Sequence, residues 1–376
     1  AGITAAVASA RRGRSVVVLN PSPYAGGMTA GGLGWTDSGK KYVIGGLARQ
    51  FYRDVGRHYG KDEVWNFEPG VAARVFARWL DDAAVDVYPV QFLDRVALDG
   101  ARIKSIRMLS GLEVQARVYI DATYEGDLMA AAGVSYTVGR ESNAQYGETL
   151  NGIQVRDKHQ FSHPVDPYRE PGNPASGPLP HVNPQDVYRL QGQGDRRIQA
   201  YCFRVCLTDD PDLRVPWEKP EGFDPDEYIL AARWFNSEKD DYNELLMPDG
   251  ELRKFDRLER PHKTDTNNHG PVSSDYIGAN YAWPEAGYEE REAIFQKHVT
   301  YQKGLYWFLA NDPSIPARYR EALGSWGLAA DEFVETSNWP HQLYIREARR
   351  MVAAYVMTEH DCMHRAACED PVGMGS

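Results

Sequence analysis

The histidines are the first residues to examine for proton transfer, because imidazole titrates near neutral pH. Among the ten histidines, His269 is the best candidate, since it lies in the polar turn 266–271 beside a glycine. A structural histidine that caps this turn is an equally good interpretation. His341 precedes a predicted helix and ranks second, whereas His58 and His298 lie in helical patterns and are expected to be packed or solvated.

Two groups of arginines differ in what the sequence predicts for them. Arg204 lies in the apolar, alternating stretch 201–205, where a guanidinium is costly unless it meets an anion. It could clamp a carboxylate or an electron-rich ring edge, and a buried structural ion pair is the alternative. The pattern predicts a helix over residues 343–357, with Tyr344, Ala348, Met351, Val352 and Tyr355 on a face that packs in the core. Its arginines, Arg346, Arg349 and Arg350, are expected on a solvated face.

A glycine-rich segment near the start of the chain could lie against a flat or charged ligand. Residues 26–34 hold five glycines in nine positions, mixed with Met28 and Leu33 and followed by Trp35. Glycine permits close backbone approach and positive φ, and Met, Leu and Trp are unusual in a solvent loop. A flexible surface loop is the alternative.

The elements around this segment form half of a βαβ unit. Residues 3–12 predict a helix and residues 15–19 a buried parallel strand. Gly2 lies where the last glycine of a dinucleotide-binding fingerprint belongs, and Asn20 lies where an acidic residue would bind ribose hydroxyls. The fingerprint's first strand and first two glycines would precede residue 1, so an ordinary αβ segment of another doubly wound protein stays open.

Further elements follow along the chain. Helices are expected over 43–58 and 68–84, then a small antiparallel sheet over 86–119 with a turn at Asp99–Gly100. Residues 116–120 predict a strand that leads into the small and acidic turn 121–127 and then a helix. Such a strand end is where an α/β sheet binds its ligand.

Residues 140–340 differ in composition, with long aromatic and proline-rich stretches. Seven prolines and several glycines between 157 and 197 exclude long regular elements there. A disordered linker is one interpretation. Apolar anchors, among them Phe161 and Tyr188, favour an ordered, loop-rich cap that excludes water from a reacting centre.

Composition excludes several classes of partner. The 376 residues carry a formal charge of −11, which argues against a nucleic-acid surface, and no apolar run approaches the length of a membrane span. The four cysteines, Cys202, Cys206, Cys362 and Cys368, match no zinc or cluster spacing, so we expect no metal. We expect a soluble protein with a small-molecule substrate. Because the chain opens at Ala1, we expect N-terminal sequence to be missing, so neither a signal peptide nor a compartment can be assigned, and the oligomeric state is equally open.

Four segments together resemble a known family: AGGMTAGGLGWTD, IDATYEGDLMAAAGVSYTVGRES, KTDTNNHGPVSSDYIGANY and WPHQLYIREARRMV. They are similar to bacterial FAD-dependent oxidoreductases whose flavin domain is related to the heterodisulfide reductase flavoprotein subunit, some of them catalogued as xanthan lyase-like. The resemblance implies an FAD cofactor, a further C-terminal flavin segment that the chain lacks, and Arg346 as a candidate for the active-site rim. The heterodisulfide-type relatives bind iron–sulfur clusters, but the cysteine spacings of this chain do not support such a cluster here. The residues implied to surround FAD are Gly2, Asn20, Gly26, Gly27, Met28, Thr29, Gly31, Gly32, Ala122, Thr123, Tyr124, Glu125, Gly126 and Asp127.

We therefore expect an α/β fold with a discontinuous, Rossmann-like FAD-binding domain and an inserted helical and loop-rich α+β substrate region. The FAD domain is expected over 1–40 and 85–140, a helical segment over 41–84 and the substrate region over 141–376. The leading functional hypothesis is oxidation of a hydroxyl group on a polar substrate, such as a sugar, with hydride passing to flavin N5 and His269 as base. The alternatives are a flavin-dependent reductase of an activated C=C bond, with Arg204 or Arg346 as donor or clamp, and an electron-transfer subunit without its own substrate.

Overall fold

The computed structural model describes residues 1–376 except 158, 162, 238–251, 253 and 364–376. The chain divides into two compact units, which are described separately. The first comprises Ala1–Val138 and Ile345–Ser376, and the second comprises Gly139–Tyr344. Among the residues described, no helix combines the length and the apolarity that a membrane crossing needs.

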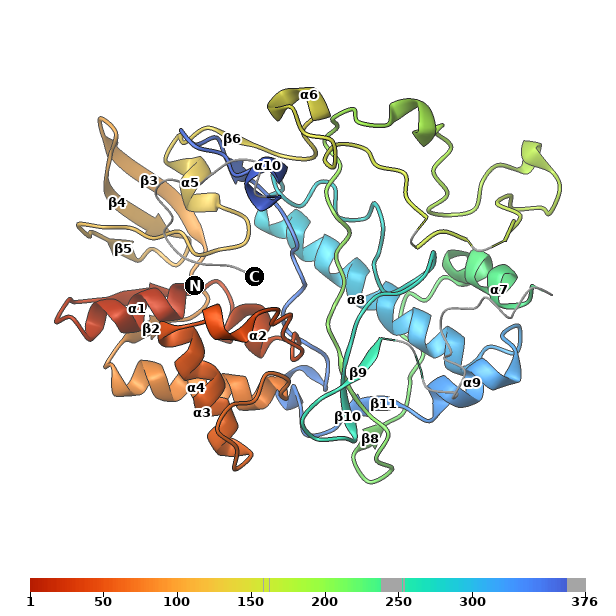
Figure 1. Ribbon diagram of the computed structural model, residues 1–376, viewed down its shortest axis with the longest axis horizontal. Helices are drawn as coiled ribbons and strands as arrows, with labels where there is room; N and C mark the ends of the chain where they lie inside the picture. The colour runs from red at the N-terminus through yellow and green to blue at the C-terminus, as the bar shows by residue number, and fades with distance from the viewer. Residues whose placement is uncertain (158, 162, 238–251, 253, 364–376) are drawn as a thin grey trace. The chain divides into compact units, whose positions relative to one another are not determined.

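The first unit opens with the expected helix and strand. Helix α1 spans Gly2–Ala10, and strand β1, Val17–Leu19, pairs in parallel with β2, Asp86–Tyr88. Parallel pairing requires a crossover between the two strands. Here the crossover carries α2 (Gly27–Ala30), η1 (Lys41–Val43), α3 (Gly46–His58) and α4 (Pro69–Asp82), shown from red to orange in Figure 1.

The two longer crossover helices confirm the predictions for residues 43–58 and 68–84. Their apolar faces meet in one core, in which Val55, Phe67 and Trp79 are almost fully buried. Asp54 is also buried there, where it accepts a hydrogen bond of 2.7 Å from Trp79 Nε1. Val18 of β1 and Val87 of β2 pack against this core, and α4 contacts both α1 and α2.

The rest of the first unit is an antiparallel sheet with short elements after it. Strands β3 (Leu93–Asp99), β4 (Arg102–Met108) and β5 (Glu113–Val114) pair in sequence order, and the turn at Asp99–Gly100 is where it was predicted. The sheet does not begin at residue 86 as expected, because β2 pairs with β1. Helix α5 (Asp127–Ala131) and strand β6 (Tyr136–Thr137) follow. The C-terminal segment adds β12 (Arg350–Met351), antiparallel to β6, and α10 (Glu359–Cys362).

Two predicted elements of this unit are wrong. Residues 116–120 form no strand: Val118 and Ile120 are exposed, and the amide of Ala116 donates to the Tyr119 hydroxyl at 2.8 Å instead of joining a ladder. Residues 343–357 form no helix, because the segment runs extended and pairs with β6 through Arg350 and Met351. Of the predicted apolar face, Ala348 is buried and Tyr344 is half-buried, whereas Met351, Val352 and Tyr355 are exposed.

The second unit is built on a five-stranded antiparallel sheet in the order β8-β11-β7-β10-β9. Its strands are β7 (Cys206–Thr208), β8 (Arg214–Val215), β9 (Phe255–Arg257), β10 (Lys263–Thr266) and β11 (Gly327–Ala329). Its helices are α6 (Asn143–Tyr146), α7 (Ile229–Phe235), the long α8 (Tyr288–Asn311) and α9 (Ala317–Gly324). The 3-10 turns are η2 (Pro174–Ser176), η3 (Val187–Leu190), η4 (Pro225–Tyr228) and η6 (Val334–Thr336).

The described residues of the proline-rich stretch 157–197 form no long helix or strand, as predicted. Side chains from elsewhere hold it: Arg233 of α7 donates to the carbonyl oxygens of Asp166 and Tyr168, and Phe161 packs edge-on against Trp234. Tyr188 is not the expected anchor, because its side chain is exposed. The described residues of the stretch thus form an ordered loop region.

Candidate functional site

The start of α1 has main-chain donors that no side chain caps. The helix has no side-chain cap and no acidic residue in its first turn, so its N-terminal amides and the positive end of its dipole remain available. Gly2 lies so close to the 121–127 turn that a Cβ on it would be 3.3 Å from Ala122 Cβ. Such a helix start binds phosphate oxygens well.

Asn20 directly follows β1, at the sheet edge where doubly wound folds bind their ligands. Its side-chain amide donates to the carbonyl oxygens of Ser22 and Tyr24, at 2.6 and 3.0 Å. Both donors of the amide are thus used to shape the loop, which leaves Oδ1 as the atom that can accept from a hydroxyl. This is the role that a carboxylate plays at the ribose in related folds.

The glycine segment is held against the 121–127 turn. Tyr124 Oη accepts from the Met28 amide at 2.8 Å, and a Cβ on Gly27 would lie 2.5 Å from that hydroxyl. Gly26 and Gly27 have φ of 121° and 54°, which L side chains rarely adopt. Protein packing therefore explains both glycines without any ligand. Of the remaining predicted residues, Met28, Gly31 and Gly32 are buried and Thr29 is half-buried.

Asp121 organises the turn that carries the other predicted cofactor residues. Its Oδ1 accepts from the Thr123 amide at 3.0 Å and the Thr123 hydroxyl at 2.7 Å, while its Oδ2 accepts from the Met129 amide at 3.1 Å. Thr123 Oγ1 in turn accepts from the Gly126 amide at 3.0 Å. The turn is therefore fixed by its own side chains before α5 begins.

Arg349 is a residue of this site that the sequence did not indicate. Its Nη1 donates to Asp127 Oδ1 at 2.6 Å and to the Glu125 carbonyl oxygen at 3.2 Å. The side chain is only 9% exposed, so the expected solvated position is wrong. Local patterns could not have revealed it, because its ion-pair partner lies 222 residues earlier.

These groups fit the FAD that the sequence resemblance implies. The uncapped start of α1 suits a pyrophosphate, and Asn20 offers an acceptor for a ribose hydroxyl. The Nε atom of Arg349 is buried and has no hydrogen-bond partner among the described residues, as expected of a donor meant for a bound group. All of them belong to the first unit.

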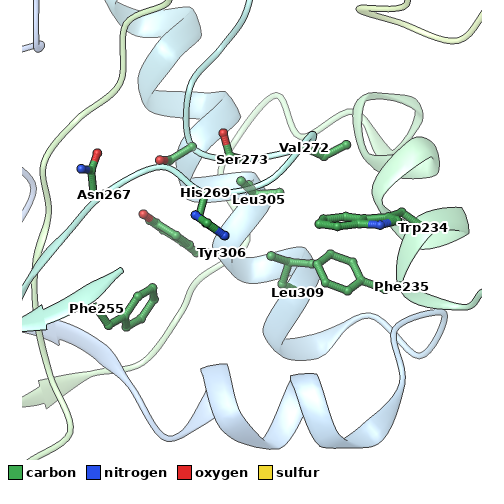
Figure 2. Close-up of a pocket in the computed structure, with 11 residues that line it drawn as sticks. Trp234, Phe235, Phe255, Asn267, His269, Val272, Ser273, Leu305, Tyr306 and Leu309 are labelled. Atoms are coloured by element: carbon green, nitrogen blue, oxygen red, sulfur yellow. The ribbon is translucent and has the colours of Figure 1, made fainter. Parts of the chain in front are cut away.

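In the second unit, His269 borders a cavity of about 40 Å³ (Figure 2). Its imidazole lies at the centre of the lining residues, with Asn267 and Tyr306 on one side and Trp234 and Phe235 on the other. The remaining lining residues are Phe255, Val272, Ser273, Ser274, Leu305 and Leu309. This volume holds a few water molecules or a small polar group, but not a whole sugar ring.

Arg204 forms a buried ion pair with Asp265, which is the alternative that the sequence left open. Its Nε and Nη2 donate to the two oxygens of Asp265 at 2.8 and 2.7 Å, and both side chains are buried. This fork-to-fork pair leaves the guanidinium little capacity for a substrate carboxylate.

His341 and Arg346 lie close in sequence but belong to different units. Burial lowers the pKa of His341 to about 4, an effect that Glu335 opposes only in part, so its imidazole is neutral at pH 7. Its ring packs edge-on against Phe333, with ring centroids 5.5 Å apart. Arg346 is half-buried in the extended segment before β12.

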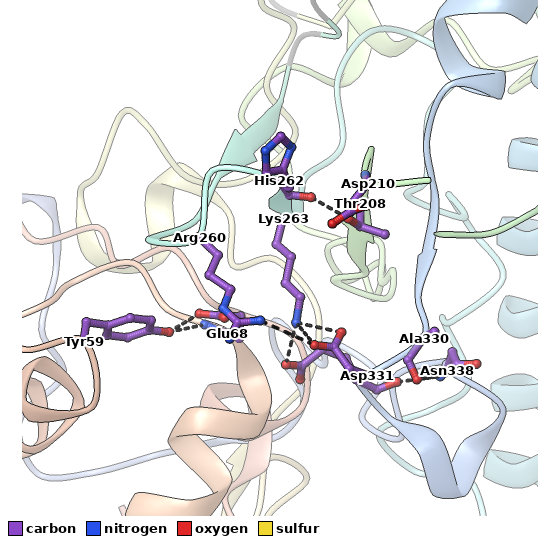
Figure 3. Close-up of polar contacts among 11 residues, drawn as sticks. Tyr59, Glu68, Thr208, Asp210, Arg260, His262, Lys263, Ala330, Asp331 and Asn338 are labelled. Carbon is purple, nitrogen blue, oxygen red and sulfur yellow. Dashed lines mark hydrogen bonds and ion pairs between the residues drawn. The ribbon is translucent and has the colours of Figure 1, made fainter. Parts of the chain in front are cut away.

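Lys263 is a second buried charge that the sequence did not single out. Its Nζ lies 2.8 Å from the Asp331 carboxylate and 3.3 Å from Glu332 Oε1 (Figure 3). Burial alone would lower the pKa of Lys263, but these carboxylates outweigh burial and raise it. Asn338 ties the same loop by donating to the carbonyl oxygens of Ala330 and Glu332.

The described part of the chain offers no group of three or more His, Cys, Asp or Glu side chains placed to hold a metal ion. Cys202 and Cys206 are buried and Cys362 is exposed, and none of the three forms a disulfide. Cys368 lies outside the described residues.

Comparison with known proteins gives one family and weak structural likenesses. The family model described as "FAD dependent oxidoreductase" matches residues 1–376. No curated protein matches the chain. Among solved structures, "Structural and Functional Studies of BexE: Insights into Oxidation During BE-7585A Biosynthesis" is 14% identical with a TM-score of 0.28, covering 43% of this chain and 37% of that one. "Crystal structure of AlpK" is 14% identical with a TM-score of 0.24, covering 41% of this chain and 40% of that one. This chain thus spans less than half the length of either protein.

Proposed function

The chain belongs to the FAD dependent oxidoreductase family, so it is an FAD-dependent enzyme with a Rossmann-like FAD-binding fold, and we propose that it oxidises a hydroxyl group of a polar small molecule. Sugars and their derivatives are the first substrate class to test. We also propose a division of labour, in which the first unit binds FAD and the second is an inserted substrate region. The second unit, Gly139–Tyr344, lies in sequence between the two stretches of the first.

The lining of the His269 cavity is the observation that carries the hydroxyl assignment. Its polar side chains, Asn267, His269, Ser273, Ser274 and Tyr306, are neutral hydrogen-bonding groups apart from any protonation of the histidine. Among the residues that the structure describes, no Asp, Glu, Lys or Arg lines the cavity. A neutral lining suits an alcohol rather than a carboxylate or phosphate, because a desolvated anion requires a partner charge. The volume of about 40 Å³ would take only the reacting end of a larger substrate.

Bound FAD supplies the hydride acceptor, and the protein supplies orientation and proton transfer. In the proposed mechanism, His269 accepts the hydroxyl proton at an imidazole nitrogen as the carbon–hydrogen bond breaks, which leaves a carbonyl product. Asn267 and Tyr306 would hold the substrate oxygen in place. The aromatic walls formed by Trp234 and Phe255 would exclude water from the reacting atoms.

The two other functional hypotheses have less support. A C=C reductase would use a cationic side chain as clamp or donor, but the Arg204 guanidinium is already paired with Asp265. Arg346 remains its candidate. An electron-transfer subunit would have no need of a neutral, polar cavity.

Anaerobic bleaching of the flavin tests the proposal. The full chain is reconstituted with FAD and mixed without oxygen with a panel of monosaccharides and sugar alcohols, and the loss of flavin absorbance is followed. At least one alcohol should bleach the flavin. Failure of every alcohol, together with reoxidation of pre-reduced flavin by an unsaturated acid, would overturn alcohol oxidation in favour of the reductase.

The variant His269→Ala assigns the base. We expect it to keep bound flavin but to bleach roughly 100-fold more slowly or worse, the range expected for loss of a general base. His58→Ala, in which an exposed histidine of α3 is lost, is the matched control and should bleach like the wild type. An unchanged rate in His269→Ala would remove His269 from the mechanism.

A further inference from the structure

Arg349 is a largely buried cation of the first unit. It belongs to the extended segment that leads into β12, and its side chain is only 9% exposed. Its guanidinium lies over the ring of Tyr136, with Cζ 5.2 Å from the ring centroid. With the contacts of Nη1 to Asp127 and Glu125, the side chain is held from several sides.

One of its donors, the buried Nε, has no hydrogen-bond partner in the part of the chain that the structure describes. A guanidinium is always charged, and leaving a buried N–H of a charged group unpaired is unfavourable. By contrast, Arg204 satisfies its own Nε with a carboxylate oxygen of Asp265. An acceptor supplied by a ligand would resolve the difference.

We propose that Arg349 binds the cofactor directly, with its Nε–H donating to an oxygen of FAD. Arg349 binds the turn 121–127, and this turn also contacts Gly2 and the glycine-rich segment 26–34. Ala122 lies beside Gly2 at the start of α1, and Tyr124 bonds the Met28 amide at the start of α2. The same turn continues through residues 125–127, where Arg349 Nη1 is anchored, so a ligand that lies beside Gly2 at the start of α1 would also lie near this guanidinium.

The acceptor oxygen belongs either to the pyrophosphate or to the flavin half of FAD, and ADP distinguishes the two. ADP carries the diphosphate and lacks the isoalloxazine and ribityl groups. If Arg349 contacts the diphosphate, both ADP and FAD bind the variant more weakly than the wild type. If it contacts the flavin half, only FAD does. Both outcomes support the proposal.

A purely structural role for Arg349 makes a different prediction. In that case the side chain only fixes the 125–127 turn through Nη1. Lysine can keep the charge and reach Asp127, but it has no counterpart of Nε. Arg349→Lys therefore removes the proposed contact while sparing the ion pair. Arg350→Lys is the matched control, because Arg350 is the adjacent residue, pairs with Glu347 and is more exposed.

The experiment titrates FAD and ADP into flavin-free full-length chain and follows quenching of flavin fluorescence and displacement by ADP. We expect Arg349→Lys to raise the FAD Kd roughly tenfold, the effect of one charge-assisted hydrogen bond, while Arg350→Lys binds like the wild type. Thermal unfolding of the flavin-free variants should match the wild type. Equal FAD affinity in wild type and Arg349→Lys would overturn the proposal.

A second measurement keeps the test decisive if the variant is less stable. Arginine Nε–H groups give resolved signals in nitrogen-15 NMR, and the signal absent from Arg349→Lys identifies Arg349. FAD should shift this signal and slow its exchange with water. A signal that FAD leaves unmoved would make Arg349 structural and overturn the proposal, even if affinity falls with stability. A wild-type chain that took up no FAD would overturn both this proposal and the proposed function, whereas bleaching by alcohols can succeed with Arg349 playing no part.

Discussion

Two buried arginines show how the same residue type can serve structure or ligand binding. Arg204 places Nε and Nη2 on both oxygens of Asp265, so the pair is nearly self-sufficient. Arg349 uses Nη1 within the protein and leaves Nε without an acceptor in the described chain. Burial alone therefore does not separate the two roles. What separates them is whether every donor is satisfied.

For Arg204, the structure predicts a large loss of stability when this arginine alone is replaced, and a smaller loss when Asp265 is replaced with it. Arg204→Met should lower the free energy of unfolding by about 3–5 kcal/mol, because it leaves Asp265 charged and buried without its partner. Chemical denaturation of the full chain, followed by tryptophan fluorescence, measures the loss. The double variant Arg204→Met/Asp265→Leu removes both charges and should recover most of it. A double variant no more stable than the single one would contradict this account.

At the residue scale, the sequence correctly predicted the environment of a residue where its chemistry allows few environments. An arginine among apolar residues must meet an anion, and Arg204 does. His269 was chosen for its polar turn, and its place at a cavity wall agrees with that choice but does not test its role. Arg349 and Lys263 were missed because their carboxylate partners are 222 and 68 residues away. No local pattern encodes such a distance.

Helices and strands were predicted correctly where local sequence determines them, and wrongly where contacts with distant residues do. The helices α3 and α4 and the hairpin β3–β4 were predicted correctly, because period and turn residues are local signals. Residues 116–120 have strand composition but find no ladder partner among the described residues. Residues 343–357 have helical periodicity, yet pairing with Tyr136 and Thr137 determines their extended conformation. Distant pairing overrode local preference in the second case.

The glycine element yields a prediction that separates backbone strain from contact. Gly27→Ala combines a φ of 54° with a Cβ placed 2.5 Å from the Tyr124 hydroxyl, so the free energy of unfolding should fall by well over 1 kcal/mol. Gly13→Ala is the matched control: its φ is 71°, but its Cβ would meet nothing within 4 Å, so only the strain of about 1 kcal/mol remains.

Urea denaturation of both variants, repeated in a Tyr124→Phe background, measures the contact. Removing the hydroxyl should make Gly27→Ala less costly and leave the cost of Gly13→Ala unchanged. If Gly27→Ala were as mild as Gly13→Ala in the wild-type background, the close packing of Tyr124 on Gly27 would not hold.

At the scale of the whole molecule, the chain passes twice between the two units. It leaves the first unit after Val138 and returns at Ile345. The return is fixed by contacts inside the first unit, namely the β12–β6 pair and the Arg349–Asp127 ion pair. A discontinuous FAD domain was expected from the sequence, but these contacts join residues more than 200 positions apart, so the return could not be inferred from residues 345–363 alone.

Stability of the whole molecule should depend on pH through its buried histidines. Burial lowers the pKa of His298 to about 4, partly offset by its Nδ1 contact with the Ile294 carbonyl oxygen, and His341 is lowered to about 4 as well. Both imidazoles are neutral in the fold, whereas in the unfolded chain they titrate near 6.5. Between pH 6.5 and 4 the unfolded state therefore binds more protons, and the free energy of unfolding falls as the pH falls.

For His298, which is almost fully buried, the shift corresponds to a loss of about 3 kcal/mol at pH 4 relative to pH 7. Denaturation midpoints of the full chain across pH 4–8 measure this slope. Carboxylates whose pKa is lowered in the fold, such as Glu63, Asp195 and Asp209, add to it in the same direction towards pH 4, so the histidine contribution is read from the comparison of variants. His298→Phe keeps a ring at the site but cannot take up a proton, so its stability should vary less with pH in this window, while His58→Gln, at an exposed position, should follow the wild type. Parallel curves for wild type and His298→Phe would show that the buried imidazole is protonated in the fold after all.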